Sequence, residues 1–75
     1  MIITVDLHLR TNPQDEHRNL GLVAVEHDGN CVAPHDDIAC VTGDRLVRAH
    51  ITAVRQQGDH LPHVYAEVCA DEEVR

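Results

Sequence analysis

The sequence predicts a small α+β domain in which an antiparallel sheet carries one helix packed on one of its faces. Two observations predict this fold. Stretches in which apolar and polar residues alternate, a pattern typical of strands, occur near both ends of the chain. Between them, residues 44–57 place most of their apolar side chains on one side of a helical wheel. With 75 residues, the chain is expected to form a single domain, residues 1–75.

The first half of the chain predicts strands. Residues 3–9 alternate strictly between apolar and polar, as in a strand with one wet face, and residues 20–27 are more continuously apolar, as in a central strand. The polar stretch 11–19 between them is expected to be an exposed loop. Asp28-Gly29 is typical of a tight hairpin turn, which predicts a short returning strand at residues 31–33.

Residues 38–41 form a further short apolar segment. It is either another strand or the lead-in to the helix. Pro34, which cannot donate a ladder hydrogen bond, separates it from the preceding predicted strand.

The segment from Asp44 to Gly58 is predicted to be the helix. Asp44 can cap the first turn, Gly58 can take the left-handed conformation after the last turn, and Pro62 follows as a stop signal. On a helical wheel, one side carries Leu46, Val47, His50, Ile51 and Val54. The same segment also fits a strand with Val47, Ala49, Ile51 and Ala53 on one face, but the capping signals favour the helix. After it, alternation over residues 64–69 predicts the last strand, followed by an acidic tail.

The predicted core is thin. The chain has no Phe and no Trp, and it has one Tyr, Tyr65. Such aromatic side chains usually supply much of the buried area of a small core, so this core is expected to bury little. Self-association would add burial, and a sheet of this kind leaves edges open for pairing. The sequence therefore predicts a homodimer or a higher oligomer.

The charge balance limits the partners. Thirteen Asp and Glu against six Arg give a formal net charge of −7, which argues against direct binding to nucleic acid. An acidic chain suits a basic protein partner, or simply solubility. Three cysteines without CxxC spacing predict reduced thiols and a cytoplasmic location. No apolar run approaches the ~20 residues of a membrane span, and residues 1–10 lack the basic start of a signal sequence.

No complete catalytic, metal or cofactor site is predicted. His60 and His63 form an HxxH pair, but the cysteines that usually complete a structural zinc site are scattered. The chain has no Ser, and Cys40 is expected to be a buried structural residue rather than a nucleophile. The carboxylate pairs 15–16 and 36–37 are adjacent in sequence, so on a strand their side chains would point to opposite faces. The expected protein is not an enzyme; the alternative is a small enzyme or metal-dependent protein that uses its His and Cys residues.

Residues 20–62 resemble the N-terminal domain of HicB-type antitoxins. The similar segments are Val23–Glu26, Asp28-Gly29, Val32-Ala33, Asp37–Asp44 and Gly58–Pro62. The resemblance implies a partial ribonuclease-H-like sheet with one helix, and a function in neutralising a small basic toxin ribonuclease. Many members of the family carry a separate DNA-binding segment at the C-terminus. The chain leaves no room for one after the last predicted strand, so operator binding is not expected.

Together these features predict a non-catalytic, antitoxin-like module that binds and regulates a basic protein. The expected contact surface comprises Glu26, His35, Asp36 and Asp37, where the hairpin meets the segment before the helix. Carboxylates at this surface would steer a cationic partner and then pair with its Arg or Lys side chains. An acidic inhibitor encoded by a mobile element is an alternative within the same class.

Overall fold

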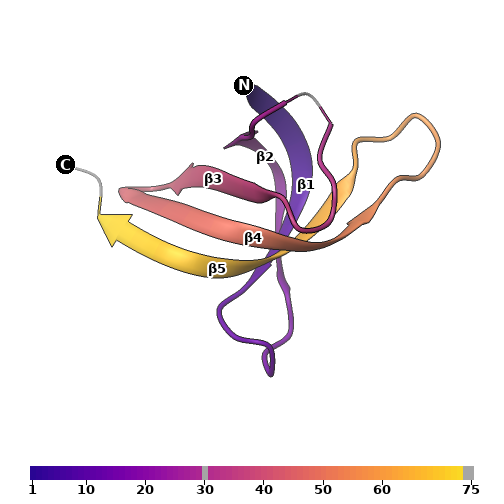
Figure 1. Cartoon of the computed structure of the whole chain (residues 1–75). Helices are drawn as coiled ribbons and strands as arrows, with labels where there is room; N and C mark the ends of the chain where they lie inside the picture. Colours follow the sequence, from indigo (N-terminus) through magenta and orange to yellow (C-terminus); the bar gives the residue numbers. More distant parts are fainter. Residues whose placement is uncertain (30, 74–75) are drawn as a thin grey trace.

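The computed structural model describes residues 1–29 and 31–73, and every regular element among them is a β-strand (Figure 1). The strands are β1 (Ile2–Arg10), β2 (Arg18–Glu26), β3 (Asp37–Thr42), β4 (Arg45–Arg55) and β5 (His63–Glu73). The predicted α+β class, with a helix packed on a partial ribonuclease-H-like sheet, is therefore wrong, because the strands instead close into a small all-β barrel. The described residues contain no helix that could cross a membrane.

The barrel is a meander whose last strand returns to its first. Each strand pairs antiparallel with the next one along the chain. Because the number of strands is odd, β1 and β5 run in the same direction, and the pairing that closes the barrel is parallel, from Asp6↔His63 to Arg10↔Glu67. Among the described residues, the other strand pairs are all antiparallel.

The segment predicted as a helix is β4. Gly43 and Asp44 do not cap a helix; they form the tight turn between the paired residues Thr42 and Arg45. Gly43 has a φ of 65° and Asp44 does not have a positive φ, as in a type II′ hairpin turn with glycine at its first central position. A glycine-aspartate pair therefore serves as a hairpin turn where the sequence suggested a helix cap.

Pairing on both sides explains why β4 is extended. Val47, Ala49 and Ile51 alternate with more exposed residues and are at most 6% exposed, as the alternative strand pattern required. β4 bonds to β3 on one side and to β5 on the other. A helix cap is worth only about 1 kcal/mol, so it cannot outweigh two hydrogen-bonded ladders and the burial of a complete strand face. Ala53 departs from this face because the register with β5 shifts between Ile51 and Ala53.

The predicted strand at residues 31–33 is also wrong. The described residues between β2 and β3, 27–29 and 31–36, form a loop, and the third strand begins at Asp37, so the short apolar segment 38–41 belongs to β3. Gly58 does take a positive φ of 56°, but within the β4–β5 connection rather than at a helix end. The first, second and last predicted strands correspond to β1, β2 and β5.

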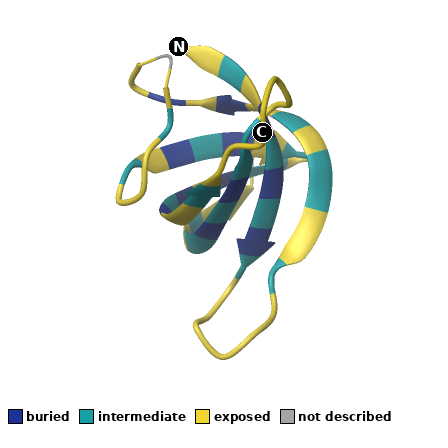
Figure 2. Cartoon of the chain, turned by 90° about the vertical axis from the view of Figure 1, so that its right-hand side faces the viewer, coloured by how far each residue is buried: buried dark blue, intermediate teal, exposed yellow. Residues whose placement is uncertain are grey.

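The inward faces of all the strands make one aliphatic core. Most buried positions lie along the middle of the strands, while most loop residues are exposed (Figure 2). Leu7, Ile51, Val5, Val25 and Val64 are the largest fully buried side chains. The core is completed by Leu9, Ile38, Cys40, Val47, Ala49 and Ala66.

The barrel is not evenly closed. β2 and β3 share a single register pair, Glu26↔Ala39, whereas β3 and β4 pair along the whole of β3. Beyond that pair, the β1–β2 hairpin extends downward in Figure 1 while β3, β4 and β5 extend to the left, so the two arms diverge. We call the opening between residues 18–25 of β2 and residues 40–42 of β3 the seam.

Replacing Ile51 with alanine should test the barrel core. Ile51 is fully buried in β4, so Ile51→Ala should lower the free energy of unfolding by about 2–5 kcal/mol. Arg48→Ala on the exposed face of the same strand should change it by less than about 0.5 kcal/mol. Urea unfolding of both variants, followed by circular dichroism, makes the measurement. Equal effects of the two substitutions, or a helical spectrum of the native protein, would contradict the fold.

Candidate functional site

The residues of the expected contact surface gather where β2 meets β3. Glu26 ends β2, Asp37 begins β3, and His35 and Asp36 lie just before it. Each carboxylate already has a neighbour: Glu26 Oε1 lies 3.0 Å from the Met1 amino group, and Asp37 Oδ1 lies 3.0 Å from His50 Nδ1. The surface therefore consists of carboxylates that each have a nitrogen-bearing neighbour, rather than of isolated acidic groups.

Asp36 has a structural role that the sequence did not indicate. Its Oδ2 atom lies 2.9 Å from Nε2 of His27 and also accepts a hydrogen bond from the backbone N–H of Ala33. His27 is only 6% exposed, and its Nδ1 lies 3.0 Å from the carbonyl oxygen of Gly29. Both ring nitrogens therefore face acceptors, and only the imidazolium can donate to both at once. The pair ties the start of the 27–36 loop to its end.

The electrostatics follow from this geometry. The hydrogen bonds to Gly29 and then to Asp36 raise the pKa of His27 above its ordinary value of 6.5, against the opposing effect of burial. The hydrogen bond from His27 is the main reason why the pKa of Asp36 lies below its ordinary value of 3.8. Both shifts favour the charged form of each partner, as expected for an ion pair.

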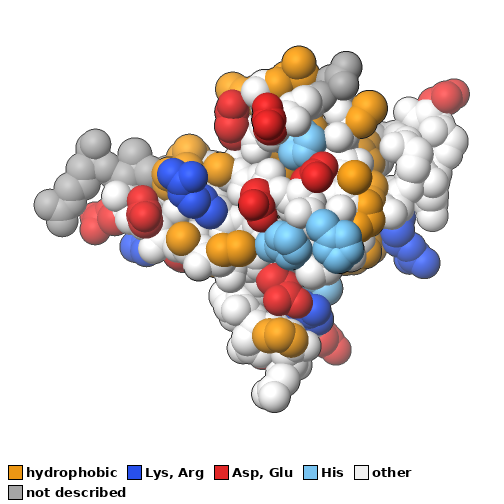
Figure 3. All heavy atoms as spheres, viewed as in Figure 1, with side chains coloured by type: hydrophobic (Ala, Val, Ile, Leu, Met, Phe, Trp, Pro, Cys, Tyr) orange, Lys and Arg blue, Asp and Glu red, His pale blue; other side chains and the backbone are white. Residues whose placement is uncertain are grey.

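Backbone contacts hold Asp36 in place. The N–H of His35 donates to the carbonyl of Ile51, and the N–H of Ile51 donates to the carbonyl of Asp36, so the loop continues the β3–β4 ladder. His35 has a φ of 78°, in the left-handed region that few non-glycine residues adopt. Its side chain is exposed, and its ring lies 5.9 Å from that of His50. Histidines and carboxylates are interspersed on this face of the molecule (Figure 3).

A second feature is the seam. Exposed apolar side chains flank it: Ile2 is 70% exposed, and Leu22 and Val41 are each 64% exposed. The depression between the two strands is lined largely by apolar residues, namely Ile2, Val23, Ala24, Val25, Glu26, Ala39, Cys40, Val41 and Leu46. At the open end it leads towards a cleft of about 720 Å³ whose apolar residues include Leu9, Leu20, Val47 and Val68. The seam therefore combines a free strand edge with apolar side chains.

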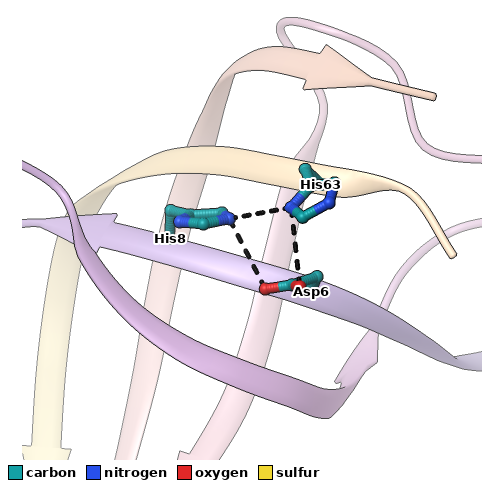
Figure 4. Close-up of side chains that lie close together, drawn as sticks. All are labelled: Asp6, His8 and His63. Carbon is teal, nitrogen blue, oxygen red and sulfur yellow. Dashed lines mark hydrogen bonds and ion pairs between the residues drawn. The ribbon is translucent and has the colours of Figure 1, made fainter. Parts of the chain in front are cut away.

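A third feature is a cluster of two imidazoles and a carboxylate on the outside of the β1–β5 pairing. Asp6 and His8 point outward from β1, and His63 begins β5, so the three side chains face one another (Figure 4). His8 Nε2 lies 3.1 Å from His63 Nδ1 and 3.4 Å from Asp6 Oδ1, and His63 Nδ1 lies 3.5 Å from Asp6 Oδ2. These are residue types that bind divalent transition metals.

The surroundings fix the orientation of His8. Its ring stacks on that of Tyr65, with centroids 4.4 Å apart and planes 12° from parallel. The ring of His17 contacts the ring of Tyr65 edge-on. Burial is the main cause that lowers the pKa of His17, and the charge of Arg10 lowers it further. Arg10 itself donates to Glu67 at 2.6 Å, across the same parallel pairing.

The HxxH pair that the sequence suggested is not the unit that the structure assembles. His63 belongs to the cluster but His60 does not, and the other two members come from the opposite end of the chain. None of the cysteines contributes to the cluster: Cys31 and Cys69 are exposed, and Cys40 is buried. Burial raises the pKa of the Cys40 thiol, which keeps it protonated and agrees with a structural role.

Comparisons of the chain with protein-family models, with curated proteins and with solved structures find no match.

The His27–Asp36 pair predicts a specific dependence of stability on pH. Because the pKa of His27 is raised in the folded state, its contribution is complete below the ordinary value and is lost as the pH rises through the raised pKa. Because the pKa of Asp36 is lowered, its contribution is lost as the pH falls through that pKa. His27→Gln should therefore reduce the free energy of unfolding by about 1–3 kcal/mol at pH 6, and by less at pH 9.

Urea titrations at both pH values would measure this difference, with His60→Gln as the control because His60 is exposed in the β4–β5 loop. A loss at His27→Gln that is equal at pH 6 and pH 9 would show that the charge of His27 does not contribute.

Proposed function

We propose that the protein is a non-catalytic binding module that takes up an extended segment of a basic partner protein along the free edge of β2. The observation that carries the proposal is the seam, where a nine-residue strand, β2, has one register pair with β3 instead of a full ladder. A strand edge of this kind can pair with the backbone of another chain, and neighbouring apolar side chains then add specificity.

The apolar residues beside the seam support this use. Leu22 and Val41 lie on opposite strands of the seam and both expose most of their side chains to solvent. Isolated exposed apolar residues are common, but here Val41 lines a depression with apolar walls, and Leu22 precedes Val23, which lines the same depression. An added strand would cover all three features at once.

Charge supports a basic partner. The chain has a formal net charge of −7. Glu26, Asp28 and Asp37 surround a depression of about 420 Å³ at the closed end of the seam, together with Arg48. Such carboxylates raise the rate at which a cationic partner arrives, more than they raise its final affinity.

The resemblance to HicB-type antitoxins suggests a specific partner, a basic toxin ribonuclease. Since the segment predicted as the family's helix is β4, we assign the contact to the seam and to the carboxylates at its closed end. Edge-to-edge pairing of two β2 strands would give the homodimer expected from the thin core, and such a dimer would compete with the partner for the seam.

Removing the apolar side chains beside the seam should weaken partner binding. Leu22→Gln and Val41→Gln change exposed side chains without changing the charge, so the fold should be retained. Leu61→Gln is the matched control, because Leu61 is also an exposed apolar residue but lies in the β4–β5 loop. Each variant would serve as bait for affinity capture with quantitative mass spectrometry.

The proposal expects a basic protein that is retained by the native chain and by Leu61→Gln but lost with both seam variants. Equal retention by all four baits, or a seam-dependent partner that is acidic, would contradict it. If the seam variants instead only convert a dimer to a monomer in light scattering, a second copy occupies the seam and the proposal is wrong.

The carboxylates should affect the rate of association. The triple variant Glu26→Gln, Asp28→Asn, Asp37→Asn should slow association with the captured partner by about tenfold at low salt, and the difference should shrink as salt is added. Asp36 is excluded from this variant because its bond to His27 stabilises the loop. The control, Asp44→Asn, Asp59→Asn, Glu72→Gln, changes the net charge equally at exposed positions elsewhere. Surface plasmon resonance over a salt series measures both variants; equal slowing would show that only net charge matters.

A further inference from the structure

We propose that Asp6, His8 and His63 form a binding site for a divalent transition-metal ion, with Zn²⁺ as the ion that fits the donors best. The donors are two imidazole nitrogens and one carboxylate, a set that proteins use for zinc when a further coordination position is left open to water or another ligand. The site is separate from the seam in its chemistry, and its proposal does not depend on the proposed function.

The separations between donor atoms match the requirements of such an ion. Zinc bonds of about 2.0–2.1 Å in tetrahedral geometry place neighbouring donor atoms about 3.3 Å apart. The three separations in the cluster are 3.1, 3.4 and 3.5 Å. The two distances to Asp6 end at different carboxylate oxygens, Oδ1 for His8 and Oδ2 for His63, so small side-chain movements are needed to bring three donor atoms around one ion.

The hydrogen bonding within the cluster is incomplete, which favours an ion. Oδ1 of Asp6 is buried and accepts no hydrogen bond from the described residues, although His8 Nε2 lies 3.4 Å away. His8 Nε2 and His63 Nδ1 face each other at 3.1 Å, so one of them must carry a proton between the two rings. A divalent ion would replace that proton and would also satisfy the carboxylate oxygen.

The surrounding structure holds the donors in position. Asp6 and His8 are two residues apart on β1, so they project from the same face of the strand. His63 is placed beside Asp6 by the parallel pairing, and the backbone N–H of Asp6 also donates to the carbonyl of Pro62 at 2.9 Å. The ring of His8 is stacked on Tyr65. The side chains of Asp6, His8 and His63 are 22%, 12% and 33% exposed, so the group is sheltered but still reachable from solvent.

An ion at this position would join β1 to β5, the two strands whose pairing closes the barrel. Since the ion would bind the folded chain better than the unfolded chain, it should also stabilise the barrel. Zinc binding should therefore be visible in two independent ways, as heat of binding and as a rise in the melting temperature.

The test is a titration of the untagged protein with ZnCl₂, monitored by isothermal calorimetry and by thermal unfolding. The protein would carry Cys31→Ala and Cys69→Ala, so that the exposed thiols do not bind the ion. We expect one zinc ion per chain, a higher melting temperature with zinc, and no comparable effect of Mg²⁺. Co²⁺ in place of Zn²⁺ should give the visible absorption of a four- or five-coordinate complex.

Variants identify the ligands. His8→Gln and His63→Gln should each weaken zinc binding by about 100-fold or more, since losing a residue that merely orients a ligand already weakens binding by about 10–100-fold. His60→Gln is the matched control and should bind like the parent, because His60 is not part of the cluster. No saturable binding to the folded parent protein would overturn the proposal, and so would equal binding by all three variants. The parent titration keeps the test decisive even if a variant fails to fold.

Discussion

The parallel pairing of β1 with β5 is the contact on which the remaining structure depends. Five consecutive antiparallel strands bring the first and last strands side by side in the same direction, and their pairing turns an open meander into a barrel. Its inner face buries Leu7 and Val64 completely. Its outer face aligns Asp6 and His8 of β1 with His63 of β5. The β1–β5 pair therefore contributes to the core on its inner face and carries the candidate metal site on its outer face.

Connection length explains where the barrel closes tightly and where it opens. The Gly43-Asp44 turn is so short that β3 and β4 must pair from their first residues after the turn. The connection between β2 and β3 spans residues 27–36 and enforces no such pairing, so the strands meet at Glu26 and Ala39 and then diverge. The His27–Asp36 pair fixes the two ends of this connection, and with them the closed end of the seam.

The sequence alone predicted those strands in which the alternation of apolar and polar residues fits a strand but not a helix. Strict alternation over residues 3–9 predicted β1 almost to its ends. Alternation over residues 64–69 predicted only the first part of β5, which continues to Glu73 through residues expected to be an acidic tail. β4 could not be predicted in the same way, because its apolar residues satisfy a helical period as well as a period of two. Asp44 and Gly58 suit turns as readily as helix ends, and the contacts that decide between the two are made with β3 and β5, far along the chain.

The candidate sites show the same limit. Glu26, Asp36 and Asp37 were expected to lie together, and they do, but the burial of His27 that makes Asp36 structural is a tertiary effect. His8 and His63 are 55 positions apart, so neither spacing nor the HxxH pattern could bring them together. Asp6 and His8 stand out only once β1 is known to pair with β5, which places His63 beside Asp6.

Residue-level hydrogen exchange measured by NMR tests the central claim, a barrel closed at β1–β5 and open at β2–β3, most directly. The structure predicts slow exchange for the amides of residues 7–9 and 64–66, where the parallel pairing lies. In β2, amides directed towards β1 should exchange slowly, while the alternate amides between residues 18 and 25 that are directed into the seam should exchange fast. Uniform protection along β2, or fast exchange throughout the paired part of β5, would contradict the account.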